Sequence, residues 1–232
     1  MDTTIAWLLE GPEWLKYATT TQLLDTEGDA DAALRDSAIQ KLLARLKDNR
    51  RGLAALITGA VSSEVQGSAL WDLFFLADIG FKAVHLGIER EIDTILNSQL
   101  RDGSFITEAG MESNYYCKSA ILLASLARLG YADAPPLVRY LERLLSEQRP
   151  NDGWHCEDYR DACPMDNLNI LMLLSQYEAY RKDRRFNGAL DLLLEHWQKR
   201  DSGYRLTGFG TGRRYRSLQY PAIKYGILRV LD

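Results

Sequence analysis

The sequence predicts an all-α protein built from helix pairs that repeat about every 50 residues. Three observations lead to this fold class. First, a glycine-aromatic turn recurs at constant spacing. Second, helical segments with one apolar face alternate with helical segments that are apolar nearly all round. Third, no stretch shows the sustained two-residue alternation of a strand. Alternation of half-exposed and buried helices at this period predicts an inner and an outer ring of helices.

The recurring turn ends an amphipathic run with polar residues and a glycine. Because glycine adopts a positive φ without a Cβ clash, this composition is typical of a helix C-terminus that leads into a turn. We expect the aromatic residue after each glycine to pack the turn onto the body of the protein. The three copies are 98–105, 147–154 and 197–204, with Gly103, Gly153 and Gly203 each 50 residues apart, and a weaker copy ends at Gly52-Leu53.

The helices between these turns are of two kinds. Outer helices with one apolar face are expected at 88–96 (Ile88, Ile92, Ile95, Leu96) and 137–145 (Leu137, Val138, Leu141, Leu144, Leu145). Inner helices, apolar nearly all round, are expected at 67–79, 115–129 and 168–174. A helix without a polar face is buried on all sides, so these segments are predicted to form the core.

The remaining elements follow from local signals. Two short helices broken at Gly11-Pro12 are expected over 3–24, and one helix over 29–47. Pro135-Pro136 starts an outer helix, since proline is tolerated in the first turn. A long loop is expected at 204–220, with a last helix from about Pro221. We therefore predict a single domain, 1–232, with N-terminal helices in 1–47 and helix-pair repeats over 48–232.

Composition narrows the function classes. With 232 residues, a formal charge of −4 and a pI near 5.5, the chain lacks the basic excess that a nucleic-acid partner requires. The N-terminus has neither the basic nor the apolar region of a signal peptide, and no apolar run is long enough to span a bilayer. We therefore expect a cytoplasmic protein. Its three cysteines are then expected to be buried thiols or metal ligands rather than disulfides.

The turns, the helix-pair period and the buried inner helices resemble the prenyltransferase and squalene-cyclase repeat superfamily, especially its small bacterial terpenoid-cyclase-like members. The segments that carry the resemblance are Ala6–Glu10, Cys117–Asp133, Gln148–Trp154 with Cys156 and Cys163, and Tyr220–Asp232. The resemblance implies an α/α toroid, and an activity of prenyltransferase or cyclase type if the protein is an enzyme.

The catalytic motifs of that superfamily are incomplete here. The nearest string to the cyclase acid motif Asp-x-Asp-Asp is Asp29-Ala-Asp31-Ala32, which we interpret as a helix cap. Asp161-Ala-Cys163 is similar to the zinc-binding pair of protein prenyltransferases, but the later histidine, expected near Gln219 or Tyr220, is missing. Whether the chain is catalytic stays open at this point.

All three cysteines fall on one side of the predicted helix-pair repeats, and this suggests a metal site there. In a toroid the N-termini of inner helices gather at one end, so Cys117, Cys156 and Cys163 could converge there. Zinc needs four ligands, and His155, Asp158, Asp161 or Asp166 could supply the fourth. The predicted metal ligands are Cys117, Cys156, Cys163 and Asp161. The alternative is three unrelated buried thiols. The other histidines, His85 and His196, are interpreted as surface or packing residues.

The inner helices also bring aromatic side chains toward a centre, where they either line a hollow for an isoprenoid chain or fill it. The predicted ligand-binding residues are Trp71, Phe75, Tyr115, Tyr116, Asp166 and Tyr225. Two hypotheses follow. The first is a toroid that binds a hydrophobic, isoprenoid-like small molecule beside a cysteine-ligated zinc. The second is a non-catalytic scaffold that binds another protein. An unfinished last helix pair would be completed by the N-terminal helices or, in a homodimer, by a neighbouring chain.

Overall fold

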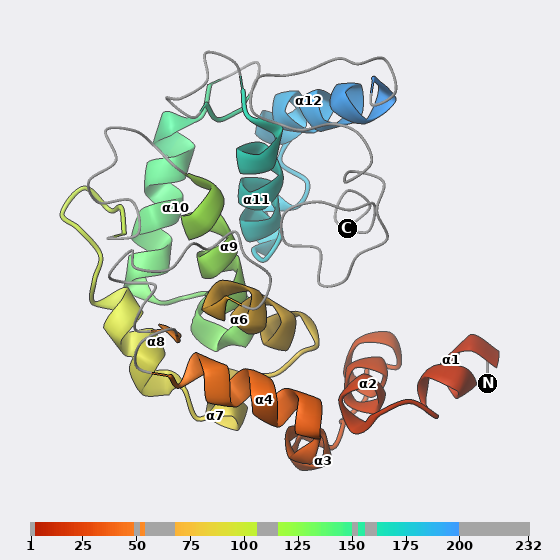
Figure 1. Ribbon diagram of the computed structural model, residues 1–232. Coiled ribbons are helices and arrows are strands. Elements are labelled where there is room, and N and C mark those ends of the chain that lie inside the picture. The colour runs from red at the N-terminus through yellow and green to blue at the C-terminus, as the bar shows by residue number, and fades with distance from the viewer. Residues whose placement is uncertain are drawn as a thin grey trace. The chain divides into compact units, whose positions relative to one another are not determined.

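The computed structural model describes residues 3–48, 52–53, 68–105, 116–149, 153–155 and 162–199 (Figure 1). All regular elements in these ranges are helices, apart from two isolated β-bridges, so the all-α prediction is confirmed for this part of the chain. No helix in these ranges is long and apolar enough to cross a bilayer. The chain divides into two compact units. Unit 1 comprises 1–97 with 128–131, and unit 2 comprises 98–127 with 132–232.

Unit 1 begins with the two expected short helices. They are α1 (Thr3–Leu8) and α2 (Glu13–Ala18), and α2 continues into a π-helical turn, Thr19–Leu23. The break falls at Gly11-Pro12 as predicted, and Pro12 is the extended N-cap of α2. Proline suits this position because a residue at the helix start needs no N–H for a hydrogen bond within the helix, whereas a residue in the helix interior does.

The single helix expected over 29–47 is wrong, because the structure has two helices there. They are α3 (Ala30–Arg35) and α4 (Ser37–Leu46), separated by Asp36 in an extended conformation. The Asp36 carboxylate accepts a 2.8 Å hydrogen bond from the N–H of Ala38 and so caps α4. Asp29 caps α3 in the same way, accepting from Ala32 at 2.8 Å, which confirms its interpretation as a cap.

The rest of unit 1 contains α6 (Ala69–Asp78), α7 (Ala83–Leu86) and α8 (Glu89–Leu96). Eight of the ten residues of α6 are buried, as expected for an inner helix. In α8 only Ile92, Ile95 and Leu96 are buried, as expected for an outer helix. A returning segment of the chain, Arg128–Tyr131, also belongs to this unit. There the Arg128 guanidinium pairs with Asp78 and lies 5.8 Å from the centre of the Phe74 ring.

Unit 2 contains α9 (Tyr116–Leu126), α10 (Pro135–Glu147), α11 (Pro164–Leu174) and α12 (Asn187–Gln198), as Figure 1 shows. Proline occupies the first turn of α10, as predicted. Nine residues of α11 are buried, whereas α10 buries only Leu137, Tyr140, Leu141 and Leu144. Val138 was expected on the apolar face but is 40% exposed, because it is rotated by about 100° from Leu137 around the helix.

The helix directions in unit 2 follow from two tyrosine hydrogen bonds. Tyr116, at the start of α9, donates to Glu147 at the end of α10, so these helices are antiparallel. Tyr177, just after α11, donates to the carbonyl of Ala132, beyond the end of α9. The C-terminal ends of α9 and α11 therefore lie together, and these two packed inner helices are parallel. This arrangement brings the N-terminal ends of α9 and α11 together.

The glycine-aromatic turns have the predicted backbone. Gly103 and Gly153 have φ values of +86° and +79°, and each lies in a turn closed by an antiparallel bridge. The aromatic residue after each of these two turns packs against an aromatic ring later in the sequence. Phe105 lies 5.9 Å from Tyr140, and Trp154 lies 6.0 Å from Phe186, between ring centres. Gly203 lies outside the described residues.

A glutamine before each of the two described turns makes the same kind of contact. The Gln99 side-chain amide donates to the carbonyl of Pro136 at 2.7 Å, and the Gln148 amide donates to the carbonyl of Arg185 at 2.6 Å. Donor and acceptor are both displaced by 49 residues between the copies. One side-chain contact in the described part of unit 2 thus recurs at a spacing close to the predicted repeat.

Candidate functional site

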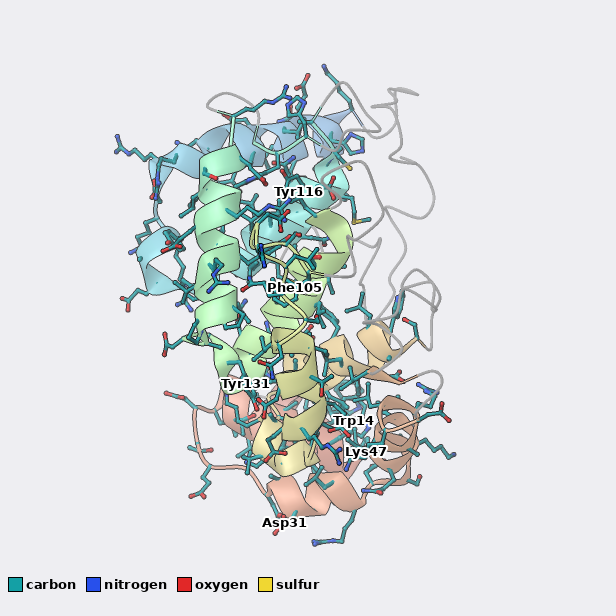
Figure 2. All side chains as sticks on the ribbon, turned by 90° about the vertical axis from the view of Figure 1, so that its left-hand side faces the viewer. Trp14, Asp31, Lys47, Phe105, Tyr116 and Tyr131 are labelled. Atoms are coloured by element: carbon teal, nitrogen blue, oxygen red, sulfur yellow. The ribbon has the colours of Figure 1, made fainter. Side chains whose placement is uncertain are left out.

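The N-terminal ends of α9 and α11 form a buried polar cluster. Tyr116 and Asp166 are each 2% exposed, and Cys163 is 8% exposed. The Tyr116 hydroxyl donates to Glu147 Oε2 at 2.8 Å, and Glu147 Oε1 accepts from Arg143 Nε at 2.9 Å. Figure 2 shows Tyr116 beside α10, the helix that supplies Glu147 and Arg143.

Burial and nearby charges both act on the Tyr116 phenol. Burial raises the pKa of the Tyr116 phenol well above its usual value, and the negative charges of Glu147 and Asp166 raise it further, while Arg143 opposes them. Tyr116, the Asp166 carboxyl group and the Cys163 thiol are thus grouped at one buried end of the helices. Carboxylates and thiolates are side-chain groups that bind metal cations.

Asn167 connects this cluster to the turn at Gly153. It is fully buried, and its Oδ1 accepts the Trp154 N–H at 3.0 Å. Its Nδ2 donates to the carbonyls of both Trp154 and Cys163, at 2.9 Å each. The segment that carries His155 is thereby held next to the first turn of α11. Cys163 is the N-cap of α11, and Asp166 follows three residues later on the same face.

The structure brings together some of the predicted site residues. Tyr116, Asp166 and Cys163 meet at one end of unit 2, and Cys117 follows Tyr116 in the first turn of α9. The Cys117 side chain and residues Tyr115, Cys156, Asp161 and Tyr225 lie outside the described part. Within that part, no three His, Cys, Asp or Glu side chains are close enough to hold a metal ion. The predicted zinc ligands thus stay a prediction.

Trp71 and Phe75, the other predicted ligand residues, lie on α6 in unit 1. Trp71 is 6% exposed, and Phe75 is half-buried with its ring in edge contact with Trp14 at 5.4 Å. Sequence reasoning missed Trp14, because a tryptophan in a short N-terminal helix carries no signal of a partner 61 residues away.

Sequence reasoning also missed Arg143 and Glu147. Both belong to the charged side of an outer helix, which usually faces water. The only available signal was their spacing of four residues at the helix end, where a glutamate is unfavourable to the helix dipole and needs a partner. From the sequence, His85 and His196 are interpreted as surface or packing residues. His85 is an exposed surface residue, and His196 is a packing residue that is fully buried in α12.

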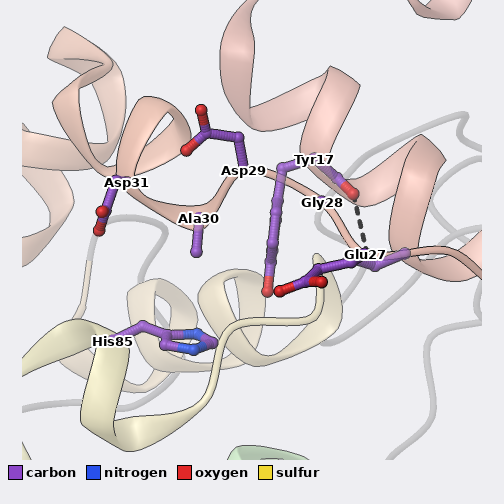
Figure 3. A pocket seen from close by; sticks show the side chains of 8 residues that line it. Tyr17, Glu27, Gly28, Asp29, Ala30, Asp31 and His85 are labelled. Carbon is purple, nitrogen blue, oxygen red and sulfur yellow. Dashed lines mark hydrogen bonds between the residues drawn. The ribbon is translucent and has the colours of Figure 1, made fainter.

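A hollow in unit 1 offers a second candidate. It has a volume of about 670 Å³, and Figure 3 shows it between the chain around Gly28 and the imidazole of His85. It is lined by Tyr17, Thr21, Glu27, Gly28, Asp29, Ala30, Asp31 and His85. The three carboxylates and His85 are exposed. Because water and salt screen exposed charges, their attraction for a cation is weak, and the buried cluster of unit 2 is the stronger candidate.

Comparisons of the chain with protein-family models, with curated proteins and with solved structures find no match.

Proposed function

We propose that the chain is a small α/α toroid that binds a hydrophobic, isoprenoid-like molecule along its inner helices and holds a zinc ion where these helices begin. One observation carries the proposal: parallel apolar helices bring Tyr116, Asp166 and Cys163 to one buried end. Apolar inner helices suit an isoprenoid chain, and a thiol beside a carboxyl group suits a metal cation.

Zinc fits the chemistry of the residues at this end. The proposed ligands are Cys117, Cys156, Cys163 and Asp161, and thiolate and carboxylate are both common zinc ligands. Bound zinc would stabilise thiolates and polarise an oxygen of a ligand. The role of the chain itself is to hold these groups in place, through the bonds of Asn167 to Trp154 and Cys163.

Metal analysis of the purified full-length chain tests the zinc site. We expect about one zinc per chain, because the four proposed ligands complete one tetrahedral site. We expect the zinc to be lost in Cys163→Ala and in Cys156→Ala. Ser125→Ala is the control: it removes a buried hydroxyl of α9, which donates to Ile121 within the helix, and should keep the metal. Metal-free protein whose three thiols react only after unfolding would contradict the site.

Solvent extraction of the purified protein, followed by mass spectrometry, tests the hydrophobic ligand separately. We expect a hydrophobic compound in the extract, at reduced amount from Trp71→Ala and Phe75→Ala variants that remain folded by circular dichroism. An extract without any such compound would contradict ligand binding and leave the zinc result unaffected.

An exposed apolar strip on α12 favours the second function, a scaffold that binds another protein. Leu190 and Leu194 lie one turn apart and are 46% and 57% exposed. A second copy of the chain is the partner we propose, because a homodimer would cover the strip. Light scattering should give a dimer mass for the wild type and a monomer mass for Leu190→Ser/Leu194→Ser. A monomeric wild type would exclude this homodimer.

A further inference from the structure

The N-terminal end of α6 carries buried hydrogen-bond donors without acceptors. Ser68 Oγ and Trp71 Nε1 have no hydrogen-bond partner among the described residues, although the two residues are only 7% and 6% exposed. A buried donor that lacks an acceptor destabilises the folded state, so such groups are rare and usually mark a bound water, ion or ligand.

Ser68 and Trp71 both belong to the N-terminal end of α6. Ser68 is the N-cap of α6, with an extended backbone, but its side chain makes no capping hydrogen bond. Trp71 lies three residues later on the same face, and long side chains of a helix point back toward its N-terminus. The first backbone N–H groups of a helix have no acceptor within the helix. The hydroxyl and backbone donors therefore lie at the same end, and we expect the Trp71 indole N–H to point toward that end as well.

The local charge also favours an anion. The N-terminus of a helix carries a partial positive charge. Asp72, in the same first turn, is 3% exposed and would oppose an anion if it were unpaired. Its two carboxylate oxygens are bound by Arg45, from Nε at 2.7 Å and from Nη2 at 2.6 Å. This bidentate pair balances the charge of Asp72 and leaves the helix end as a set of donors.

We propose that the N-terminal end of α6 binds an oxyanion, a carboxylate or phosphate group, through Ser68, Trp71 and the first backbone N–H groups of the helix. Helix N-termini bind such groups in many proteins by the same combination of donors and dipole. The site lies in unit 1 and is independent of the zinc proposed for unit 2.

NMR of the ¹⁵N-labelled full chain tests this site directly. The chain has five tryptophans, and the Trp71→Phe variant identifies the indole N–H resonance of Trp71. Phosphate, acetate and octanoate are added in turn, with sodium chloride at equal ionic strength as the control. We expect a saturable downfield shift of the Trp71 resonance, because its N–H gains an acceptor.

The three anions distinguish the source of the oxyanion. Saturation by phosphate or acetate supports a site for a free anion, whereas saturation by octanoate alone supports a site for the head group of a larger apolar molecule. If no anion gives a saturable shift, or if all five indole resonances move as they do with sodium chloride, the proposal is wrong.

Two serine variants separate binding from folding. Ser68→Ala should weaken the anion about tenfold, the loss expected for one hydrogen bond to a charged group. In anion-free buffer it should leave Tm unchanged or raise it, because it removes an unpaired buried hydroxyl. Ser125→Ala, which breaks a hydrogen bond to Ile121, should lower Tm and leave the affinity unchanged. A Ser68→Ala variant that lowers Tm without anion as Ser125→Ala does would overturn the proposal.

Discussion

At the scale of single residues, a few buried polar side chains hold the described part of unit 2 together. Asn167 is the clearest case, since its amide bonds both the N–H and the carbonyl of Trp154 and also the carbonyl of Cys163. The Trp154 indole in turn donates to the carbonyl of Leu144 in α10 at 2.7 Å. These bonds link a turn, an inner helix and an outer helix, so small changes at this point should have large effects.

Replacement of Gly153 is expected to be far more costly than replacement of Gly130. Both have positive φ, +79° and +110°, so alanine strains the backbone at either position by about 1–2 kcal/mol. A Cβ at Gly130 meets no atom within 4 Å, whereas at Gly153 it would lie 2.0 Å from Asn167 Oδ1. Urea unfolding should therefore show Gly153→Ala to be less stable than Gly130→Ala by about 2 kcal/mol. Equal losses would show that Asn167 can move away without cost.

Buried His196 should make stability depend on pH. Burial lowers its pKa below 6.5, so the unfolded chain binds the proton more tightly than the folded chain. The neutral, buried imidazole of His196 therefore contributes fully to the free energy of unfolding above pH 6.5. This contribution is lost as pH falls through the folded-state pKa of His196. Urea unfolding below pH 6.5 should show a shallower pH dependence for His196→Asn than for the wild type. His85→Asn, at an exposed position, is the control, and identical slopes for all three proteins would contradict the prediction.

At the scale of helices and turns, the local predictions succeeded where short-range interactions decide. The glycine turns, the caps at Asp29 and Pro12 and the proline start of α10 each depend on a few neighbouring residues. The wrong prediction of a single helix over 29–47 is also explained by a short-range interaction. Asp36 lies inside a helical apolar pattern, but its side chain caps a second helix instead of continuing the first.

Inner and outer helices should differ in their tolerance of truncation. Leu173 of α11 is 1% exposed, whereas Leu194 of α12 is 57% exposed. Leu173→Ala leaves a cavity and should lower the free energy of unfolding by about 3 kcal/mol. Leu194→Ala removes little buried surface and should change it by less than about 1 kcal/mol. Chemical denaturation measures both, and similar losses would mean that α12 is covered in solution, as in the proposed homodimer.

At the scale of the whole chain, the two units are interleaved along the sequence. The chain passes between them at 97–98, 127–128 and 131–132. The short segment 128–131 is flanked on both sides by unit 2, yet it contributes Arg128 to the ion pair with Asp78 in unit 1. Units connected in this way are not joined by a single linker.

We therefore expect the units to unfold together, in line with the predicted single domain. Opening of unit 1 would release Arg128 from Asp78 and from the Phe74 ring, and the freed segment is attached to α9 and α10 of unit 2. Hydrogen exchange at increasing urea, read by mass spectrometry, should show peptides from 69–96 and 164–198 losing protection at the same concentration. Earlier loss from one unit would indicate two separate domains.

The sequence alone determined the all-α class, the positions of the turns and the division into buried and half-exposed helices, because each depends on periodicity and on residues within one or two turns of each other. Only the tertiary structure decided which side chains meet. Tyr116 reaches Glu147 across 31 residues, and Asn167 reaches Trp154 across 13. Such pairs depend on the rotation and direction of packed helices, which no local pattern specifies. The buried polar cluster at the N-terminal ends of α9 and α11 could therefore be seen only after folding.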